Sequence, residues 1–310
     1  MLVLTASPFG RRRFSFKTKG CIVAKLLLGK PVADNLVERT RERAERLTAA
    51  GSAPALAVVR VGEDESALSY ERGLFKRAEA CGVQPVRVVL DAHASTADVA
   101  RALEEVNRNA QMDACLMFRP LPKTCDESAV VNLLAAEKDV DGMTAASAAA
   151  LYTGRGAGFA PCTAAACVEL LDYYQVPLDG ANVVVVGRSL VIGKPVAQLL
   201  LSRNATVTQC HSHTANLPSI MRAADIVVCA TGRARAYGAE CFSAGQTVID
   251  VGINFDDDGK MCGDVDFDAV EPIVDAITPV PRGVGSVTTS VLMAHVVEAA
   301  LAGRVGGDYE

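Results

Sequence analysis

The sequence has no tryptophan and few other aromatic residues, which together make up 5% of its 310 residues. Hydrophobic residues nevertheless account for 50% of the chain, so a large core must be built from alanine, valine and leucine. Such a composition is typical of parallel sheets covered by helices. At roughly 100–200 residues per domain, the length is sufficient for two domains.

The chain also lacks an excess of positive charge and a long apolar run. Its net charge is -5 and its isoelectric point is about 5.5, so no basic surface suggests a nucleic-acid partner. No run of about 18 apolar residues is present, and we expect no membrane span.

The ten cysteines show neither a C-x-x-C pair nor the Cys/His spacing of a zinc site. We therefore expect buried free thiols in a reducing, cytoplasmic compartment. Cys162 and His295 lie in apolar segments far apart in the sequence, and both are interpreted as packed residues. The carboxylates that could suggest a metal are better interpreted as solvated, and no metal site is predicted; they are Asp139, Asp264, Asp266 and Asp268.

No acidic residue occurs before Asp34, whereas residues 11–19 carry five cations. This pattern fits a mitochondrial-type presequence. It also fits a disordered extension, or a start codon placed too early. We favour these simpler interpretations and expect residues 1–23 to be a disordered extension.

Predicted strands and helices alternate along most of the chain. Strands are expected at 55–62, 86–90 and 113–118, with helices at 66–82, 95–109 and 126–135. A second series follows the small-residue segment 144–158. Its strands are expected at 183–187, 205–212, 225–232, 247–254 and 275–281, and its helices at 163–174, 194–204, 217–224 and 288–303. This order predicts parallel sheets with right-handed crossovers and a boundary between two α/β domains near 145–160.

Residues 183–195 read VVVVGRSLVIGKP, a strand that ends on glycine and opens a helix. This is neither the G-x-G-x-x-G motif nor the P-loop. Gly187 and Gly193 would let the backbone approach a pyrophosphate, and Pro195 suits the first turn of the helix whose N-terminus would face it. Two glycines around a strand–helix turn also occur without any ligand.

The next strand ends in CHSHT, residues 210–214, and carries no carboxylate. In NAD-binding proteins an acid about 20 residues after the glycines holds the ribose 2′-hydroxyl. Its absence, together with Arg188, favours NADP over NAD. His211 and His213 are equally consistent with ordinary loop polarity.

A series of motifs resembles, in order and spacing, the bifunctional methylenetetrahydrofolate dehydrogenase/cyclohydrolase family over residues 24–302. The motifs are PLP (120–122), EKDVDG (137–142), PCT (161–163), VVGRSLVIGKP (185–195), CHSHT (210–214), VIDVGIN (248–254), GDVDF (263–267) and ITPVPRGVGSVT (277–288). The resemblance implies two α/β domains with a cleft between them, the second a Rossmann-type, doubly wound parallel sheet. It also implies a homodimer, NADP, and a tetrahydrofolate one-carbon derivative as substrate.

The resemblance implies the following domain boundaries. Residues 24–145 with 288–310 would form the folate-binding catalytic domain, the last helix packing back on the first domain. Residues 146–287 would form the NAD(P)-binding domain.

By the same resemblance, Gly187, Arg188 and Ser189 cradle the cofactor within the loop that also contains Gly193 and Pro195. Ser212 would lie at the 2′-phosphate and Ile253 near the nicotinamide ribose. A lysine or arginine often follows that serine in the family; here His213 does, which weakens the preference for NADP.

In the catalytic set, Tyr70 and Asp141 match the family's tyrosine and pterin-binding aspartate. The family's catalytic lysine, four residues after the tyrosine, is Leu74 here, and the glutamine that holds the lysine is Phe118. Lys76 lies about 240° around the helix from Tyr70, so it is no natural substitute. Arg77 lies a turn beyond Leu74, and its guanidinium stays protonated.

The loop near the substrate also departs from the family pattern. Arg282 replaces a glycine, and Ser286 replaces a proline.

These features predict NADP-dependent oxidation of 5,10-methylenetetrahydrofolate to 5,10-methenyltetrahydrofolate. The cyclohydrolase step, which adds water to give 10-formyltetrahydrofolate, needs a group that accepts a proton. We therefore expect that step to be weak or lost. The alternative is a non-catalytic paralogue that binds NADP or folate and has a regulatory role.

Overall fold

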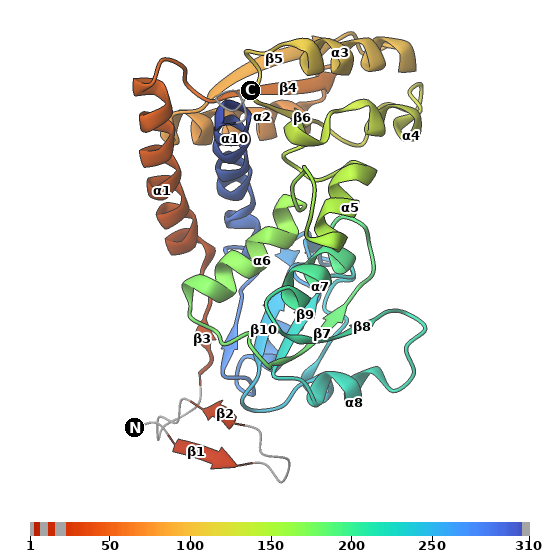
Figure 1. Cartoon of the computed structure of the whole chain (residues 1–310). Coiled ribbons are helices and arrows are strands. Elements are labelled where there is room, and N and C mark those ends of the chain that lie inside the picture. Colours follow the sequence, from red (N-terminus) through yellow and green to blue (C-terminus); the bar gives the residue numbers. More distant parts are fainter. Residues whose placement is uncertain (1–2, 7–11, 16–22, 306–310) are drawn as a thin grey trace. The chain divides into compact units, whose positions relative to one another are not determined.

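The computed structural model describes residues 3–6, 12–15 and 23–305, and the chain divides into two compact units (Figure 1). The six-stranded unit comprises Met1–Val32 and Thr163–Val287. The three-stranded unit comprises Ala33–Cys162 and Thr288–Glu310.

The three-stranded unit is built on a parallel sheet with strand order β5-β4-β6. Its strands are β4 (Ala55–Val61), β5 (Gln84–Leu90) and β6 (Ala114–Met117), and the crossovers are α2 (Glu65–Ala80) and α3 (Thr96–Arg108). Ser95 and Asp98 form a capping box that begins α3. The buried residues of α3, Val99, Ala102, Leu103 and Val106, fall at helical spacing.

Two helices of this part of the chain were not predicted. The 21-residue α1 (Gly29–Ala49) buries Val32, Leu36, Thr40 and Ala44, a four-residue repeat masked by many charged neighbours. The small-residue segment 144–158, at the expected domain boundary, contains α5 (Ala145–Thr153), capped by Thr144. The predicted helix at 126–135 is shorter, with α4 at Glu127–Val130 followed by 3-10 turns at Val131–Leu133 and Ala136–Lys138.

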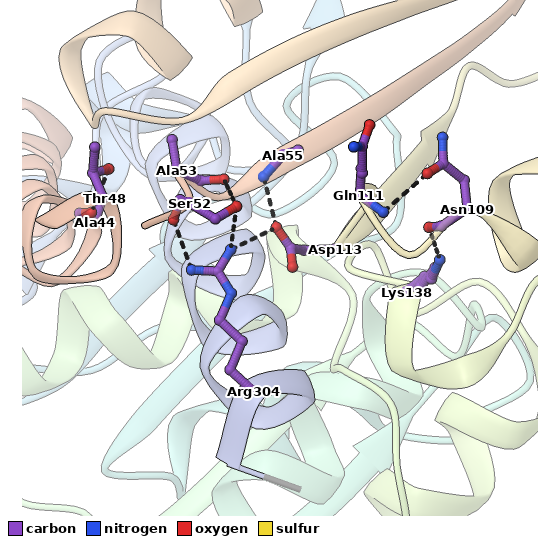
Figure 2. Close-up of polar contacts among 10 residues, drawn as sticks. All are labelled: Ala44, Thr48, Ser52, Ala53, Ala55, Asn109, Gln111, Asp113, Lys138 and Arg304. Atoms are coloured by element: carbon purple, nitrogen blue, oxygen red, sulfur yellow. Dashed lines mark hydrogen bonds and ion pairs between the residues drawn. The ribbon is translucent and has the colours of Figure 1, made fainter. Parts of the chain in front are cut away.

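The last helix, α10 (Thr288–Val305), packs against α2, β4 and β6, as the resemblance implies (Figure 1). Arg304 fastens its end. One guanidinium nitrogen donates to the carbonyl oxygen of Ser52 at 2.7 Å, and the other lies 3.4 Å from the Asp113 carboxylate (Figure 2). The same Asp113 oxygen accepts a hydrogen bond from the Ala55 backbone N–H, which begins β4.

The six-stranded unit contains a fully parallel sheet of order β3-β13-β10-β9-β7-β8. Its strands are β3 (Lys25–Leu26), β7 (Asn182–Val186), β8 (Thr206–Cys210), β9 (Ile226–Cys229), β10 (Thr247–Asp250) and β13 (Ala276–Ile277). Strand order reverses at β7, which lies between β8 and β9. In doubly wound sheets, ligands bind at the carboxyl ends of the strands at such a reversal.

The remaining elements of this unit are short connections. They are α6 (Cys162–Tyr173), α7 (Gly193–Leu201), α8 (Leu217–Arg222), α9 (Phe267–Val270), the hairpin β11 (Asn254–Phe255) and β12 (Met261–Cys262), and 3-10 turns at Ala239–Cys241 and Val284–Ser286. Asp258 and Gly259 lie in the turn between β11 and β12.

The N-terminal region differs from the sequence expectation in two places. Strand β3 pairs with β13, so residues 25–26 belong to the six-stranded sheet although 24–145 was expected to form the folate-binding domain. Within the expected disordered extension, β1 (Val3–Ala6) and β2 (Arg12–Ser15) pair antiparallel. Both carry β-branched or aromatic residues, which favour strands. Residues 1–2, 7–11 and 16–22 lie outside the described residues.

The expectation of buried free thiols is confirmed for the described residues. All nine cysteines among them are free and buried, while Cys21 lies outside the description. No described helix is both long and apolar enough to cross a membrane.

A buried ion pair fixes α2 on the three-stranded sheet. Nε of Arg60, at the end of β4, lies 2.8 Å from the Glu71 carboxylate, and both side chains are less than 10% exposed. Arg87 on β5 donates to the other carboxylate oxygen at 2.5 Å. Burial raises the pKa of Glu71, but the hydrogen bonds from Arg87 and Arg60 outweigh it and hold the pKa below its ordinary value.

We expect Glu71→Gln to lower the free energy of unfolding by about 3 kcal/mol at neutral pH, because it leaves a buried guanidinium without its counter-charge. The lowered pKa means that this contribution is present above the ordinary carboxyl value of 4.5 and is lost as pH falls through the folded value. Urea denaturation at pH 7 and below pH 4 measures both effects, and the difference between variant and wild type should shrink in acid.

Glu104→Gln is the matched control, since Glu104 forms an exposed ion pair with Arg108. It should change stability by less than about 1 kcal/mol. A Glu71→Gln effect as small as the control, or one that does not change with pH, would contradict this account.

Candidate functional site

The glycine loop of the six-stranded unit lies at the strand reversal. Gly187 directly follows β7 and has φ +134°, and a β-carbon there would lie 2.2 Å from the carbonyl oxygen of Ala230, which follows β9. A β-carbon on Gly193 would lie 2.4 Å from the Gly187 carbonyl. Only glycine allows the loop to fold this closely on itself.

The loop opens directly into α7. The hydroxyl oxygen of Ser189 accepts hydrogen bonds from the backbone N–H groups of Ile192 at 3.1 Å and Gly193 at 3.4 Å. Pro195 is buried in the first turn, while Arg188 extends into solvent. The arrangement provides a helix N-terminus beside an exposed cation, which suits a phosphate group.

The turn after β8 adjoins this loop. The Gly187 N–H donates to the carbonyl oxygen of Cys210 at 2.9 Å, and Gln209 on β8 donates to the Gly187 carbonyl at 3.1 Å. Ser212 lies exposed in the turn. The sequence-predicted residues of the first two strands therefore lie at one edge of the sheet, and no carboxylate occurs between Gly187 and His213.

Ile253 lies at a separate hollow of the same unit. It is 61% exposed and lines a cavity formed by the segment after β10, residues 250–253, Met261, and the loop 279–286. Arg282 lies in this loop at φ +84°, a left-handed conformation. The loop is held by the Gly29 N–H, which donates to the Arg282 carbonyl at 2.8 Å.

Two buried carboxylates, those of Asp264 and Asp250, hold the segments that follow β9 and β10 through hydrogen bonds. Asp264 is fully buried and accepts hydrogen bonds from Thr231, Gly232, Arg233 and Asn254, while Asp250 accepts from the backbone of Gly252, Asp264 and Val265. Burial raises the pKa of Asp250 to about 7, against the opposing effect of its backbone donors.

The prediction that these carboxylates are solvated is wrong for Asp264 and also for Asp139. Asp139 is fully buried and binds Met143, Thr144 and Ser147. Within the described part of the chain, no cluster of histidine, cysteine and acidic residues could hold a metal.

The catalytic candidates lie in the three-stranded unit. Tyr70 extends from α2, and its ring contacts that of Phe118, which follows β6, with a centroid distance of 5.3 Å and a tilt of 58°. Leu74, one turn after Tyr70, is 1% exposed. The structure therefore brings Tyr70 and Phe118 together. The two positions at which the resemblance implies a lysine and a glutamine hold the apolar side chains of Leu74 and Phe118.

The Tyr70 hydroxyl has polar neighbours on one side. Burial, together with the Asp141 carboxylate and Cys162, raises the pKa of Tyr70 to about 12, while a hydrogen bond with Thr289 opposes the shift. None of these three neighbours is a cation. Arg119, next to Phe118, is engaged by Glu127 at 2.7 Å, and Lys76 is exposed on another face of α2.

Asp141 follows the buried Asp139 in a tight turn. A β-carbon on Gly142, at φ +64°, would lie 2.4 Å from the Phe159 carbonyl, so only glycine lets the two segments approach. The Cys162 N–H donates to Asp141 at 3.4 Å. Burial raises the pKa of Asp141, and its hydrogen bonds with Cys162 oppose that shift.

Sequence reasoning missed one partner in this site. Sγ of Cys162 lies 3.7 Å from Nδ1 of His295 on α10, although no histidine was identified as its partner. Burial raises the pKa of the Cys162 thiol well above its ordinary value and lowers the pKa of His295, so neither group is charged at neutral pH. No sequence signal connects residues 133 positions apart, and the pairing arises from the fold of α10.

Comparison with known proteins finds a family match in each of the two units. The family described as tetrahydrofolate dehydrogenase/cyclohydrolase, catalytic domain, matches residues 27–141, and its NAD(P)-binding domain matches residues 161–304. The chain belongs to the tetrahydrofolate dehydrogenase/cyclohydrolase family. Its substrate class is therefore a tetrahydrofolate derivative, and its nucleotide site is that of an NAD(P)-binding domain.

This chain matches individual members of the family over nearly their whole length. The bifunctional protein FolD of Carboxydothermus hydrogenoformans is 48% identical over 279 residues, 89% of this chain and 97% of that protein. The crystal structure of the bifunctional enzyme FolD, a methylenetetrahydrofolate dehydrogenase/cyclohydrolase from Campylobacter jejuni, has a TM-score of 0.86 at 32% identity, covering 90% of this chain and 99% of that one. FolD of Trypanosoma brucei, solved in complex with NADP and an inhibitor, has a TM-score of 0.83 at 32% identity, covering 92% and 99%.

We expect Arg282→Gly to be about 1 kcal/mol more stable than Arg282→Ala. A β-carbon at this positive φ lowers the free energy of unfolding by roughly 1–2 kcal/mol. Glycine avoids this strain, but its greater freedom in the unfolded chain offsets part of the advantage. Both variants lack the guanidinium, so the comparison isolates the backbone strain. Urea denaturation measures it, and equal stabilities would show that the loop relaxes without strain.

Proposed function

We propose that the protein oxidises 5,10-methylenetetrahydrofolate to 5,10-methenyltetrahydrofolate with NADP, and that its cyclohydrolase step is weak or lost. The proposal of a weak or lost cyclohydrolase step rests on the buried Leu74, one turn after Tyr70. A hydrocarbon in this position cannot accept a proton from water.

The dehydrogenase half is supported by the glycine loop and the α7 N-terminus, whose geometry fits a dinucleotide phosphate. NADP supplies the hydride acceptor when bound, so the protein's task is to bind and orient. Gly187 and Gly193 would admit the pyrophosphate, with Ser189 and Pro195 shaping the first turn of α7. Arg188 and Ser212 would face the 2′-phosphate, and Ile253 would contact the nicotinamide ribose.

On the folate side, Asp141 would accept hydrogen bonds from pterin N–H groups. Tyr70 would lie beside the ring, and its raised pKa keeps the phenol neutral at physiological pH. Such a site aligns a substrate but offers no base for the attack of water. Losing a general base costs about 10²–10⁴ in rate, whereas hydride transfer depends mainly on alignment.

Domain organisation and assembly complete the proposal. The sequence-predicted boundaries, 24–145 with 288–310 and 146–287, shift to those of the two units: we assign the folate site to Ala33–Cys162 with Thr288–Glu310 and the nucleotide site to Thr163–Val287. The matched ranges 27–141 and 161–304 support a division between residues 141 and 161, and the second range also includes α10. We also propose a homodimer, on the family resemblance alone.

Wild-type protein should form methenyltetrahydrofolate from the methylene compound while hydrolysing added methenyltetrahydrofolate no faster than the spontaneous reaction. We expect Leu74→Lys with Phe118→Gln to raise hydrolysis at least about tenfold. The buried position would lower the pKa of the new lysine, and the glutamine would give it a partner. Spectroscopic assays of both steps on the same samples measure the change.

Leu74→Met with Phe118→Gln is the control, because it keeps an apolar side chain at the base position and should leave hydrolysis at background. Dehydrogenase activity and thermal unfolding report whether each variant is folded. Rapid hydrolysis by the wild type would contradict a lost step. Binding of NADP without any methylene oxidation would instead favour the non-catalytic alternative, which Leu74, Phe118 and Arg282 also suggest.

Cofactor choice is tested at Arg188. Arg188→Gln should raise the dissociation constant for NADP by about tenfold, the scale of a lost hydrogen bond to a charged group, and that for NAD by much less. Calorimetry with both nucleotides measures the two constants. Arg203→Gln is the control, since Arg203 follows the opposite end of α7 and pairs with Asp172 at 2.7 Å. Equal weakening of NAD and NADP would show that Arg188 does not recognise the 2′-phosphate.

A further inference from the structure

The carbonyl oxygen of Val140 receives two side-chain donors from distant parts of the chain. Nδ1 of His295 on α10 lies 2.9 Å from it. The thiol of Cys162, at the start of α6, donates to it at 3.3 Å. This carbonyl belongs to the peptide that joins Val140 to Asp141, so the two donors fix the backbone immediately before the proposed pterin ligand.

The contact also fixes the chemical form of His295. A carbonyl oxygen only accepts hydrogen bonds, so Nδ1 must carry the proton and Nε2 the lone pair. The ring is held in place by Phe159, whose centroid lies 4.9 Å away at a tilt of 32°. Burial disfavours the charged imidazolium and keeps this neutral tautomer.

Cys162 also contacts the Asp141 side chain. The backbone N–H of Cys162 donates to the carboxylate at 3.4 Å, and Sγ of Cys162 lies 3.7 Å from Nδ1 of His295. Cys162 therefore contacts both the carboxylate and the peptide before it. No other described histidine contacts this turn.

We propose that His295 is a positioning residue for substrate binding: its Nδ1–H, with the Cys162 thiol, holds the Val140–Asp141 peptide so that Asp141 is oriented toward the pterin. The inference rests on the proposed function of Asp141. His295 itself does not touch substrate or take part in proton transfer. Loss of the donor should weaken folate binding and leave hydride transfer nearly unchanged.

His295→Leu removes the donor at similar volume, and His295→Asn keeps an N–H close to the position of Nδ1. We expect His295→Leu to raise the KM for methylenetetrahydrofolate roughly 5- to 10-fold, the scale of one lost hydrogen bond, with kcat changed less than about twofold. His295→Asn should restore KM to within about twofold of wild type. His93→Leu, at an exposed histidine of the same unit, is the control and should have no effect.

A double-mutant comparison separates positioning from general support of the fold. In an Asp141→Asn background, His295→Leu should produce little further loss, because the group it orients is already gone. Full additivity, or a His295→Asn variant as impaired as His295→Leu, would overturn the proposal. Calorimetry with tetrahydrofolate gives the same comparison without turnover. If the protein does not oxidise methylenetetrahydrofolate, the proposed function is refuted, but the binding measurements still test the role of His295.

The tautomer provides an independent readout. Nitrogen NMR of the imidazole should report a protonated Nδ1 and an unprotonated Nε2 in the wild-type protein. The same spectrum in Cys162→Ala should keep this tautomer, because the carbonyl still accepts from Nδ1. A proton on Nε2 in the wild type would overturn the proposal regardless of any activity.

Discussion

The orientation of α2 depends on the buried contact between Arg60 and Glu71. Glu71 is directed into the sheet by two guanidinium groups, one from β4 and one from β5. Neighbouring residues on a helix point about 100° apart, so fixing Glu71 also fixes where Tyr70 and Leu74 face. The aromatic contact with Phe118 and the polar surroundings of the tyrosine hydroxyl are consequences of this one charged anchor.

Around that anchor, the two chemical steps of the family make different demands. Hydride transfer needs a cofactor and a substrate held in alignment, which rigid turns and buried carboxylates can supply. Water attack needs a proton acceptor in a particular place. Asp139, Asp264 and Asp250 are all committed to holding loops through several hydrogen bonds, so the buried acids of this protein serve geometry. Leu74 and Phe118, on which the proposal of a weak or lost cyclohydrolase step rests, are apolar and take no part in these hydrogen bonds.

Much of this arrangement could be predicted from the sequence, because its signals are local. Alternating strands and helices, the Gly187 turn and the Ser95 cap are each encoded within a few residues. The four-residue repeat of α1 was also present but hidden among charges, and the alanine-rich α5 has almost no amphipathic pattern to detect. The small-residue run 144–158 was therefore interpreted only as a domain boundary, although Thr144 caps a helix there.

The contacts that could not be predicted are those made between distant segments. Burial of Asp264 depends on loops from three strands converging on one carboxylate, and GDVDFD alone resembles a solvated turn. The approach of His295 to Cys162 requires the last helix to return to the three-stranded sheet. Composition placed both residues correctly in apolar surroundings but could not show that they meet.

The return of α10 to the three-stranded sheet has a consequence for how the chain matures during synthesis. The apolar face that α10 covers stays open until α10 itself has been synthesised, because Val291, Val296 and Ala300 of this helix are buried. All strands of the six-stranded sheet precede that helix and can assemble first. The three-stranded sheet, whose strands are all made before β7, is thus covered only after the six-stranded sheet can form, and the Arg304 guanidinium then donates to the Ser52 carbonyl oxygen.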